Sequence, residues 1–524
     1  MLHSRSTAAL IALSLLSAAP SARAQDPFQP GLRWIRPAQL ADAWIPTSVG
    51  FAGADQLCWS VAGGNAPRVD VESSAARGVS QPLFEDQLQD PIAGALRVST
   101  TSARNGLFVL QQTYGADLTE RDTRISRYDP LAAAAGAEFT PEWSLELSFG
   151  ANGPAILLTD DHGENGFVLL WRDETNELVV CRIDLITGGI YDYLFYAADS
   201  LDSATISDDG SRIAVVSGTT LRILDEYGYL VEERSLFAAT PALAFDDDGS
   251  HLVVGGYGGA QLLIEEADGY AQSLLLTAGA TELAKVVDVS GDASVIAIGW
   301  WNAYTGLDAR FEVFDGTNGD SLRELSFLGT PGGLQNSPSA IEVSRDGSRI
   351  ACGSWGDGDS DPELVLLDLD QEQPVLQADL PGSVLHLDLD ETGTRVLVAA
   401  KHLHANQMGV TGELRLYDTG ERDLQLLDAP RPGGHLHLAA RTPGANSAWF
   451  LVGQERKTPF GGGLALLRQG LRVISAPVLD GVAELEVPLP AGNRLLGLSP
   501  TIQAAWRVPG SLEFSETLVR PLFL

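Results

Sequence analysis

One sequence motif is repeated along this chain between Ala54 and Asp418. It consists of a small or polar turn, a short apolar run, a variable stretch, and a second apolar run that usually ends in an acid. Three copies show it best, with SDDGSRIAVV starting at Ser207, DDDGSHLVVG at Asp246 and SRDGSRIACG at Ser344. Such units cannot bury their apolar faces alone, so the repeat predicts neighbours that stack on one another.

The spacing of the repeat selects an architecture. The turn residue recurs at Asp55, Gly106, Gly153, Gly210, Gly249, Ala293, Gly347 and Gly393. The mean spacing of about 48 residues fits a four-stranded propeller blade and exceeds the period of leucine-rich or ankyrin repeats. The units are rich in β-branched residues and lack helical periodicity. We therefore predict an all-β fold, a β-propeller of about eight blades, with seven blades as the alternative.

A second recurring feature, an acid at the end of a strand, pairs one to one with these turns. The next clear strand after each turn ends in an acid, in the order Glu72, Asp129, Asp184, Asp225, Glu265, Asp315, Asp368 and Asp418. A Gly or Pro follows most of these acids within a few residues, as a turn after a strand requires. The third copy is the longest, and its excess around residues 160–165 predicts a loop insertion on one face.

These copies resemble the repeats of WD40-like and quinoprotein-like propellers. SRDGSRIACGSW, from Ser344 to Trp355, is similar to the turn and second strand of a WD40-type repeat, and FEVFDGTNG, from Phe311 to Gly319, resembles a quinoprotein-type strand and turn. The resemblance covers residues 45–430 and implies the propeller fold. No copy carries the Gly-His pair or the Trp-Asp ending of the strict WD40 pattern. Functions within this broad family are too various to transfer.

The chain divides into four predicted parts. Residues 1–24 have the layout of a cleaved signal peptide, and residues 25–44 form an N-terminal segment before the propeller at 45–430. Prolines bound short alternating runs in residues 431–524, which predicts a small antiparallel β-sandwich-like domain. This last part resembles the short C-terminal β-domains of secreted bacterial proteins. The alternative is that residues 436–467 form one more blade.

Charge and hydropathy restrict the partners and the location. The formal net charge is −35, and only three residues are lysines. So acidic a surface repels phosphate backbones, which argues against nucleic acid. No apolar run after the leader is long enough to span a bilayer, which argues against membrane insertion. We expect an exported protein, periplasmic or extracellular, whose charge keeps it soluble.

Aromatic residues supply the first candidate site. Trp300, Trp301, Tyr304 and Trp355 fall at or just past the ends of apolar runs in adjacent copies. Aromatic anchors dominate binding energy, so such a cluster could stack on a sugar or grip a protein. Aromatic residues are also common core filler, and packing between blades is the alternative.

Carboxylates supply the second candidate site. One aligned position on the first strand of copies six to eight is acidic, at Asp288, Glu342 and Asp388. Carboxylates that converge on an axis could bind a hard cation, or they could be solvated or paired with arginine. A calcium-like alternation of oxygens occurs at Asp357, Asp359 and Asp361. Pro362 stands where an EF-hand loop needs Gly, and an acidic hairpin tip explains this stretch as well.

The predicted function is therefore a binding scaffold for a protein or a glycan. The sequence contains no Gly-x-Ser-x-Gly elbow, no His-Glu-x-x-His and no phosphate loop. The alternative is a propeller enzyme, a hydrolase, lyase or quinone-dependent oxidoreductase, with its site at the mouth of the channel. Titratable groups that converge with shifted pKa values would favour the enzyme.

Overall fold

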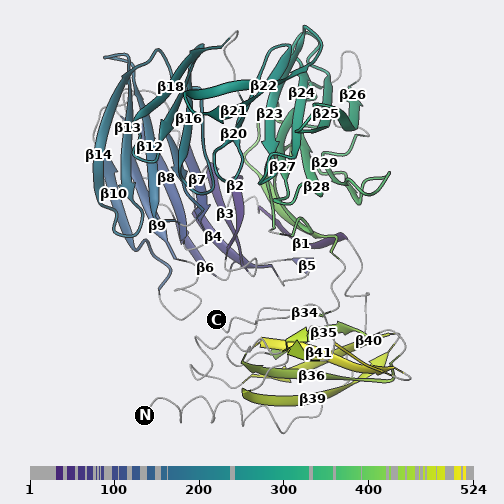
Figure 1. The fold of residues 1–524 in the computed structure, drawn as a ribbon. Coiled ribbons are helices and arrows are strands. Elements are labelled where there is room, and N and C mark those ends of the chain that lie inside the picture. The colour runs from purple at the N-terminus through teal and green to yellow at the C-terminus, as the bar shows by residue number, and fades with distance from the viewer. Residues whose placement is uncertain are drawn as a thin grey trace.

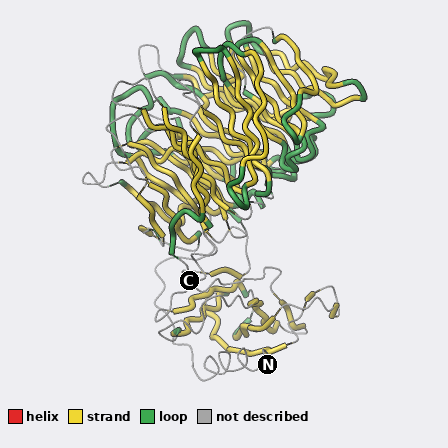
Figure 2. The backbone as a smooth tube through the Cα atoms, turned by 90° about the vertical axis from the view of Figure 1, so that its left-hand side faces the viewer, coloured by secondary structure: helices red, strands yellow, loops and turns green. Residues whose placement is uncertain are grey.

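A computed structural model of the chain consists of β-strands joined by turns, with no helix among the residues it describes (Figures 1 and 2). It describes residues 31–514, except residues 39–43, 53–56, 65–67, 75–77, 80–81, 83, 88–96, 104–105, 115–120, 130–137, 148–154, 162, 237–241, 330–333, 358–360, 391, 421–423, 427–434, 443–444, 455–458, 461–463, 466–468, 480, 490–500 and 509–510. The predicted signal peptide lies outside these residues.

Up to Asp418, small sheets follow one another along the chain, and their pairings are antiparallel apart from one short parallel pair in the last sheet. The first two contain β2 (Trp44–Ala52), β3 (Leu57–Gly64), β4 (Arg68–Ser73) and β6 (Phe84–Gln87), then β7 (Arg97–Ala103), β8 (Gly106–Tyr114), β9 (Arg121–Tyr128) and β10 (Trp143–Leu147). The next two contain β11 (Ala155–Thr159), β12 (Asn165–Arg172), β13 (Glu177–Asp184) and β14 (Ile190–Ala197), then β15 (Ser203–Ile206), β16 (Arg212–Ser217), β17 (Thr220–Asp225) and β18 (Leu230–Ser235).

The series continues in the same way. The following two sheets contain β19 (Leu243–Phe245), β20 (His251–Gly256), β21 (Gly259–Glu266) and β22 (Gly269–Thr277), then β23 (Glu282–Val289), β24 (Val295–Asn302), β25 (Asp308–Asp315) and β26 (Ser321–Leu328). The last two contain β27 (Pro338–Val343), β28 (Arg349–Ser354), β29 (Leu364–Asp368) and β30 (Leu376–Ala378), then β31 (Val384–Leu389), β32 (Arg395–Lys401) and β33 (Gly412–Asp418), completed by β1 (Gly31–Pro37) and β5 (Gly78–Val79).

The first strands of these sheets form a closed ring. Each contacts the first strand of the next sheet, in the order β2, β7, β11, β15, β19, β23, β27 and β31, and β31 contacts β2. The apolar cores lie between neighbouring sheets, where alternate residues of both sheets meet. This arrangement is the one that a β-propeller requires, because each sheet buries its faces only against its neighbours.

The N-terminal strand closes the ring. β1 pairs antiparallel with β33, placing Ile35 opposite Arg415, although its residues precede the repeat in the sequence. Trp34, fully buried, joins the core between β2 and β33. Arg36 is also buried, and it forms ion pairs with Asp70 (2.9 Å) and Glu72 of β4. Residues 31–37, within the predicted N-terminal segment, therefore contribute a strand to the last sheet of the ring.

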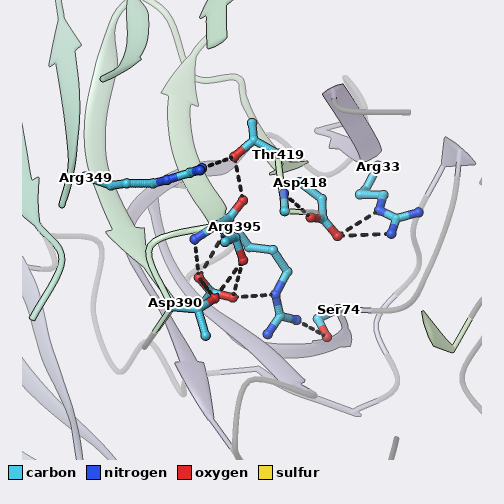
Figure 3. Close-up of polar contacts among 10 residues, drawn as sticks. Arg33, Ser74, Arg349, Asp390, Arg395, Asp418 and Thr419 are labelled. Carbon is cyan, nitrogen blue, oxygen red and sulfur yellow. Dashed lines mark hydrogen bonds and ion pairs between the residues drawn. The ribbon is translucent and has the colours of Figure 1, made fainter. Parts of the chain in front are cut away.

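Polar contacts also join β1, β4 and the last sheet where the two ends of the ring meet, a region that we call the seam (Figure 3). The guanidinium of Arg33 on β1 pairs with Asp418 on β33 at 3.0 Å. Arg395 on β32 pairs with Asp390 at 2.8 Å and donates to the Ser74 hydroxyl, just after β4, at 2.8 Å. The seam thus joins the two ends of the ring through charged as well as apolar side chains.

The repeated turn has a clear physical basis. Its first residue is a buried Ser or Asp whose side-chain oxygen accepts the N–H five residues on, as at Ser207, Asp246, Ser290, Ser344 and Asp390. Its fourth residue has a positive φ, +72° at Gly210, where glycine carries no steric cost. In the same place of another copy, Ala293 has φ +55°.

The prediction of an insertion at residues 160–165 is wrong. Those residues form the same turn, because the Gly163 N–H donates to the Asp160 carbonyl (3.1 Å), as the Gly210 N–H donates to Ser207 (2.9 Å). Residues 155–159 are the strand β11, so the turn of the third copy lies at Gly163 and not at Gly153. With its turn placed at Gly163, the third copy has a distance from the turn to the acid at Asp184 that falls within the range of the other copies.

Replacing Gly210 by Ala is expected to lower the free energy of unfolding by about 2–3 kcal/mol, because the left-handed conformation costs an L-residue about 1–2 kcal/mol and the new methyl would be crowded. The added Cβ would lie 2.9 Å from the Asp160 Cβ. Gly218 is the matched control, since its φ is +59° but a Cβ there meets nothing within 4 Å. Denaturant titration should show the smaller loss for Gly218→Ala, and equal losses would contradict the crowding.

The residues after the ring form a seven-stranded sheet of their own. Its order is β34 (Leu424–Leu426), β35 (His435–Arg441), β40 (Val482–Pro488), β39 (Gln469–Leu479), β36 (Ser447–Gln454), β41 (Thr501–Val508) and β42 (Ser511–Phe514), beside the small pair β37 (Pro459–Phe460) and β38 (Leu464–Ala465). β39 pairs with β36 along most of its length and with β40 only at its end. Alternate residues from both halves, such as Leu438 and Phe450, meet in one core.

Candidate functional site

The three aligned carboxylates lie on neighbouring first strands of the ring, Asp288 on β23, Glu342 on β27 and Asp388 on β31. We call them the axial acidic cluster. Asp288 Oδ2 accepts the backbone N–H of Val343 at 2.6 Å, and Asp388 Oδ2 accepts that of Phe51 at 2.9 Å. Each of these bonds joins one first strand to the next. Two of the carboxylates therefore fasten neighbouring sheets together.

Burial and mutual repulsion perturb this cluster. Burial raises the pKa of Asp288 to about 7, against the opposing hydrogen bonds from the Val343 and Val289 N–H groups. The pKa of Glu342 is raised well above its ordinary value, first by burial and then by the charges of Asp288, Asp388 and Asp208. The hydrogen bond between Glu342 and Asp288 raises the pKa of Glu342 and lowers that of Asp288, so the pair retains a proton more readily on Glu342 than on Asp288.

His386 lies two residues before Asp388 on β31, and sequence reasoning did not select it. Burial lowers the pKa of His386 to about 4, so its imidazole is neutral at pH 7. Its Nδ1 has no hydrogen-bond partner among the described residues. Alternation along β31 places His386 and Asp388 on the same side of the strand, a pattern that the sequence contains.

The structure does not add metal ligands to the carboxylates selected from the sequence. Within the described part of the chain, no three His, Cys, Asp or Glu side chains are grouped so that they could hold a metal ion. Asp357 and Asp361 follow Trp355, and the Asp361 N–H lies 3.5 Å from Asp357 Oδ1. Asp359 lies outside the described residues. Burial and the charge of Asp357 raise the pKa of Asp361.

The four aromatic candidates separate into two groups. Trp300 is fully buried in the core between two neighbouring sheets, so its assignment to a binding surface is corrected. Trp301, the next residue on β24, points to the opposite side and is partly exposed. Tyr304, in the turn between β24 and β25, is 90% exposed. Trp355, just after β28, is partly exposed.

A lysine brings Trp301 and Trp355 together. Lys285 Nζ lies 4.0 Å from the centre of the Trp355 ring and 5.6 Å from that of Trp301. It also donates to the Ser337 hydroxyl at 2.7 Å. Lys285 is the extra residue of a β-bulge, where the pairing of β23 with β24 shifts between Ala284 and Val286. A bulge re-aims a side chain, which explains why strand alternation did not identify this lysine.

Residues from the next sheet hold Trp355 in place. Its ring meets that of His404 edge to face, with centroids 6.1 Å apart. His404 Nε2 donates to the Gln335 carbonyl at 2.6 Å, and Nδ1 accepts the Asn406 N–H at 3.2 Å. The Trp355 carbonyl accepts the Ser383 hydroxyl at 2.7 Å. Lys285, Trp301, Ser337, Trp355 and His404, which we call the tryptophan–lysine cluster, thus come from three consecutive sheets.

No helix among the described residues is long and apolar enough to cross a membrane.

Comparison with known proteins shows the fold. No family model matches the chain, and no curated protein matches its sequence. The chain is similar to the solved Dos1 propeller, with a TM-score of 0.51 and 11% identity over 74% of this chain and 95% of that one. It is similar to Sqt1 of Chaetomium thermophilum, with a TM-score of 0.53 and 15% identity over 75% of this chain and 99% of that one. The fold is an all-β propeller.

Proposed function

We propose that this chain is an exported binding scaffold, which holds a protein or glycan ligand at the tryptophan–lysine cluster and the neighbouring Tyr304. The supporting observation is the convergence of two indole rings from neighbouring sheets on one ammonium group, with the exposed Tyr304 three residues after Trp301 in the turn that follows β24. Rigid blades that present aromatic side chains in this way suit recognition, because little conformational entropy is lost on binding. Propellers in general present such surfaces.

The proposal includes the finer architecture. Each four- or five-stranded sheet of the ring is one blade, which makes eight blades, and β1 completes the last of them. The segment from β34 onward is a small β-sandwich, since β39 passes from one half of its sheet to the other around one core. Residues 1–24 are a signal peptide that directs the chain to the periplasm or beyond.

Tyr304→Ala and Trp355→Ala test the binding face. Immobilised variants would be exposed to a glycan array and to a periplasmic extract of the source cells, and the bound ligands would be quantified. We expect each variant to reduce ligand retention at least about tenfold, as loss of an aromatic anchor does. Tyr229→Ala is the matched control, because Tyr229 is 54% exposed in the turn between β17 and β18 of another sheet. Unchanged retention in both test variants would contradict the proposal.

An enzyme is the second candidate function, favoured by the shifted pKa values of Asp288, Glu342 and His386. Groups poised in this way occur at catalytic sites, although structural pairs also show them. A thermal-shift screen with quinones and oligosaccharides would test this function, because a ligand of the folded state raises its midpoint. A rise that is absent in Glu342→Gln would support the enzyme, and no rise with any ligand would count against it.

A further inference from the structure

Among the residues that the structure describes, Lys285 is a cation without an acidic partner. Burial alone lowers its pKa to about 8, and no carboxylate contributes to that value. Within the described part of the chain it donates to a neutral hydroxyl, that of Ser337, and lies against two indole rings. Cation–π contacts compensate a desolvated ammonium only in part. The hydrogen bond to Ser337 uses one of the three N–H donors of Lys285, and the described residues supply no acceptor for the other two.

The neighbours of Lys285 add donors rather than acceptors. The Trp301 indole Nε1 has no acceptor among the described residues, and neither has the Asn336 amide Nδ2 next to Ser337. Asn336 itself is fully buried. Both of these donor atoms are buried, whereas Lys285 is partly exposed, so the ammonium is the donor that gains from an incoming acceptor. An ionised acceptor gains most, because charge-assisted hydrogen bonds are the stronger ones.

The aromatic side chains near Lys285 indicate which class of ligand carries the acceptor group. The rings of Trp301 and Trp355 lie against Lys285, and both residues are partly exposed, so they offer apolar edges and faces to a sugar ring. The chain has a net charge of −35, so an anion approaches most of its surface unfavourably. A cationic site on so acidic a protein therefore gives specificity for acidic over neutral ligands, and this contribution to specificity is larger than its contribution to affinity.

We propose that the tryptophan–lysine cluster binds an acidic sugar, with the carboxylate of a hexuronate residue on Lys285 and its ring against the aromatic side chains. This inference rests on the proposed function, whose ligand class it specifies. The carboxylate accepts hydrogen bonds from Nζ, and it supplies the counter-charge that the protein does not provide at this position.

The test is calorimetric titration of the full chain with trigalacturonate and with its methyl ester, which removes the charge and keeps the rings. We expect saturable binding of the acid, and at least about tenfold weaker binding of the ester, because the charge-assisted bonds are lost. Lys285→Met keeps the apolar stem between the rings and should weaken binding of the acid by a similar factor. Lys401→Met is the control, as Lys401 Nζ donates to the backbone carbonyls of Ala405 (3.3 Å) and Gln407 and lies against no aromatic ring among the described residues.

The outcomes separate the two proposals. Equal binding of acid and ester, or unchanged binding in Lys285→Met, would overturn the carboxylate site while binding at the aromatic face still stands. Binding of neither probe would overturn the acidic-sugar inference, and the Tyr304→Ala and Trp355→Ala experiment would still decide the proposed function. Unchanged circular dichroism and melting temperature of Lys285→Met would show that any loss of binding is local.

Discussion

Replacing Arg36 by methionine is expected to lower the free energy of unfolding by about 3–5 kcal/mol at pH 8, because removal of one partner leaves buried charge uncompensated. Arg36 is 4% exposed, and Asp70 and Glu72 are each 1% exposed. Burial already raises the pKa of Glu72 to about 7, against the attraction of Arg36. Without Arg36 the Glu72 carboxyl would have to bind a proton to stay buried, while Asp70 retains Arg68, so the loss should be smaller at pH 5.

Two further variants identify the cause of this loss. Arg124→Met removes an exposed pair with Glu146, whose side chains are 41% and 67% exposed, and should change stability by less than about 0.5 kcal/mol. Adding Glu72→Gln to Arg36→Met removes the carboxylate that Arg36 alone pairs with and should recover much of the loss, whereas Asp70 keeps its pair with Arg68 at 2.7 Å. If Arg36→Met lowered the free energy of unfolding no more than Arg124→Met, Arg36 would not form the buried ion pairs with Asp70 and Glu72 described above.

Replacing Glu342 by glutamine should stabilise the protein by about 2 kcal/mol at pH 8 and have little effect at pH 5. A carboxyl whose pKa is higher in the folded chain than in the unfolded one takes up protons on folding. Its contribution is therefore present in acid and is lost as the pH rises through the folded value. Asp288, with a pKa of about 7, behaves in this way, and Glu342 shifts in the same direction.

Glutamine retains a donor for Asp288 and carries no charge, so the variant should also flatten the pH profile. The wild-type melting temperature should fall by about 5 °C or more between pH 5 and pH 8, and that of Glu342→Gln should fall less. Glu372→Gln, at an exposed position, is the control and should follow the wild type. If the melting temperatures of the wild type and Glu342→Gln changed with pH in parallel, Glu342 and Asp288 would not share a proton.

The repeated part of the fold follows from the sequence because each copy carries its own signals. The Ser207 oxygen and the Gly210 conformation are local requirements, so they recur wherever the turn recurs. The third copy misled the prediction since Gly153 and Gly163 both fit a turn, and only strand pairing distinguishes them. The closing strand has no such signal, because Ile35 pairs with Arg415 far along the chain.

The candidate site was predictable in part for a similar reason. Asp288, Glu342 and Asp388 share a register position, and alignment of the copies finds such positions. Trp300 could have been assigned to the core, since alternation along β24 groups it with the buried Ile298. Lys285 could not have been selected in this way, because it sits in a bulge and its contact with Trp355 crosses between sheets.

The most direct test of the whole account is whether β1 and β33 close the ring, because the site depends on sheets held at fixed positions around it. Ile35 and Arg415 are paired across these strands, and the cysteines present among the described residues are buried. The doubly substituted chain Ile35→Cys, Arg415→Cys, oxidised and mapped by peptide mass spectrometry, should contain an intramolecular disulfide between these positions. Two thiols that stay reduced in the oxidised monomer would contradict a ring closed by its N-terminal strand.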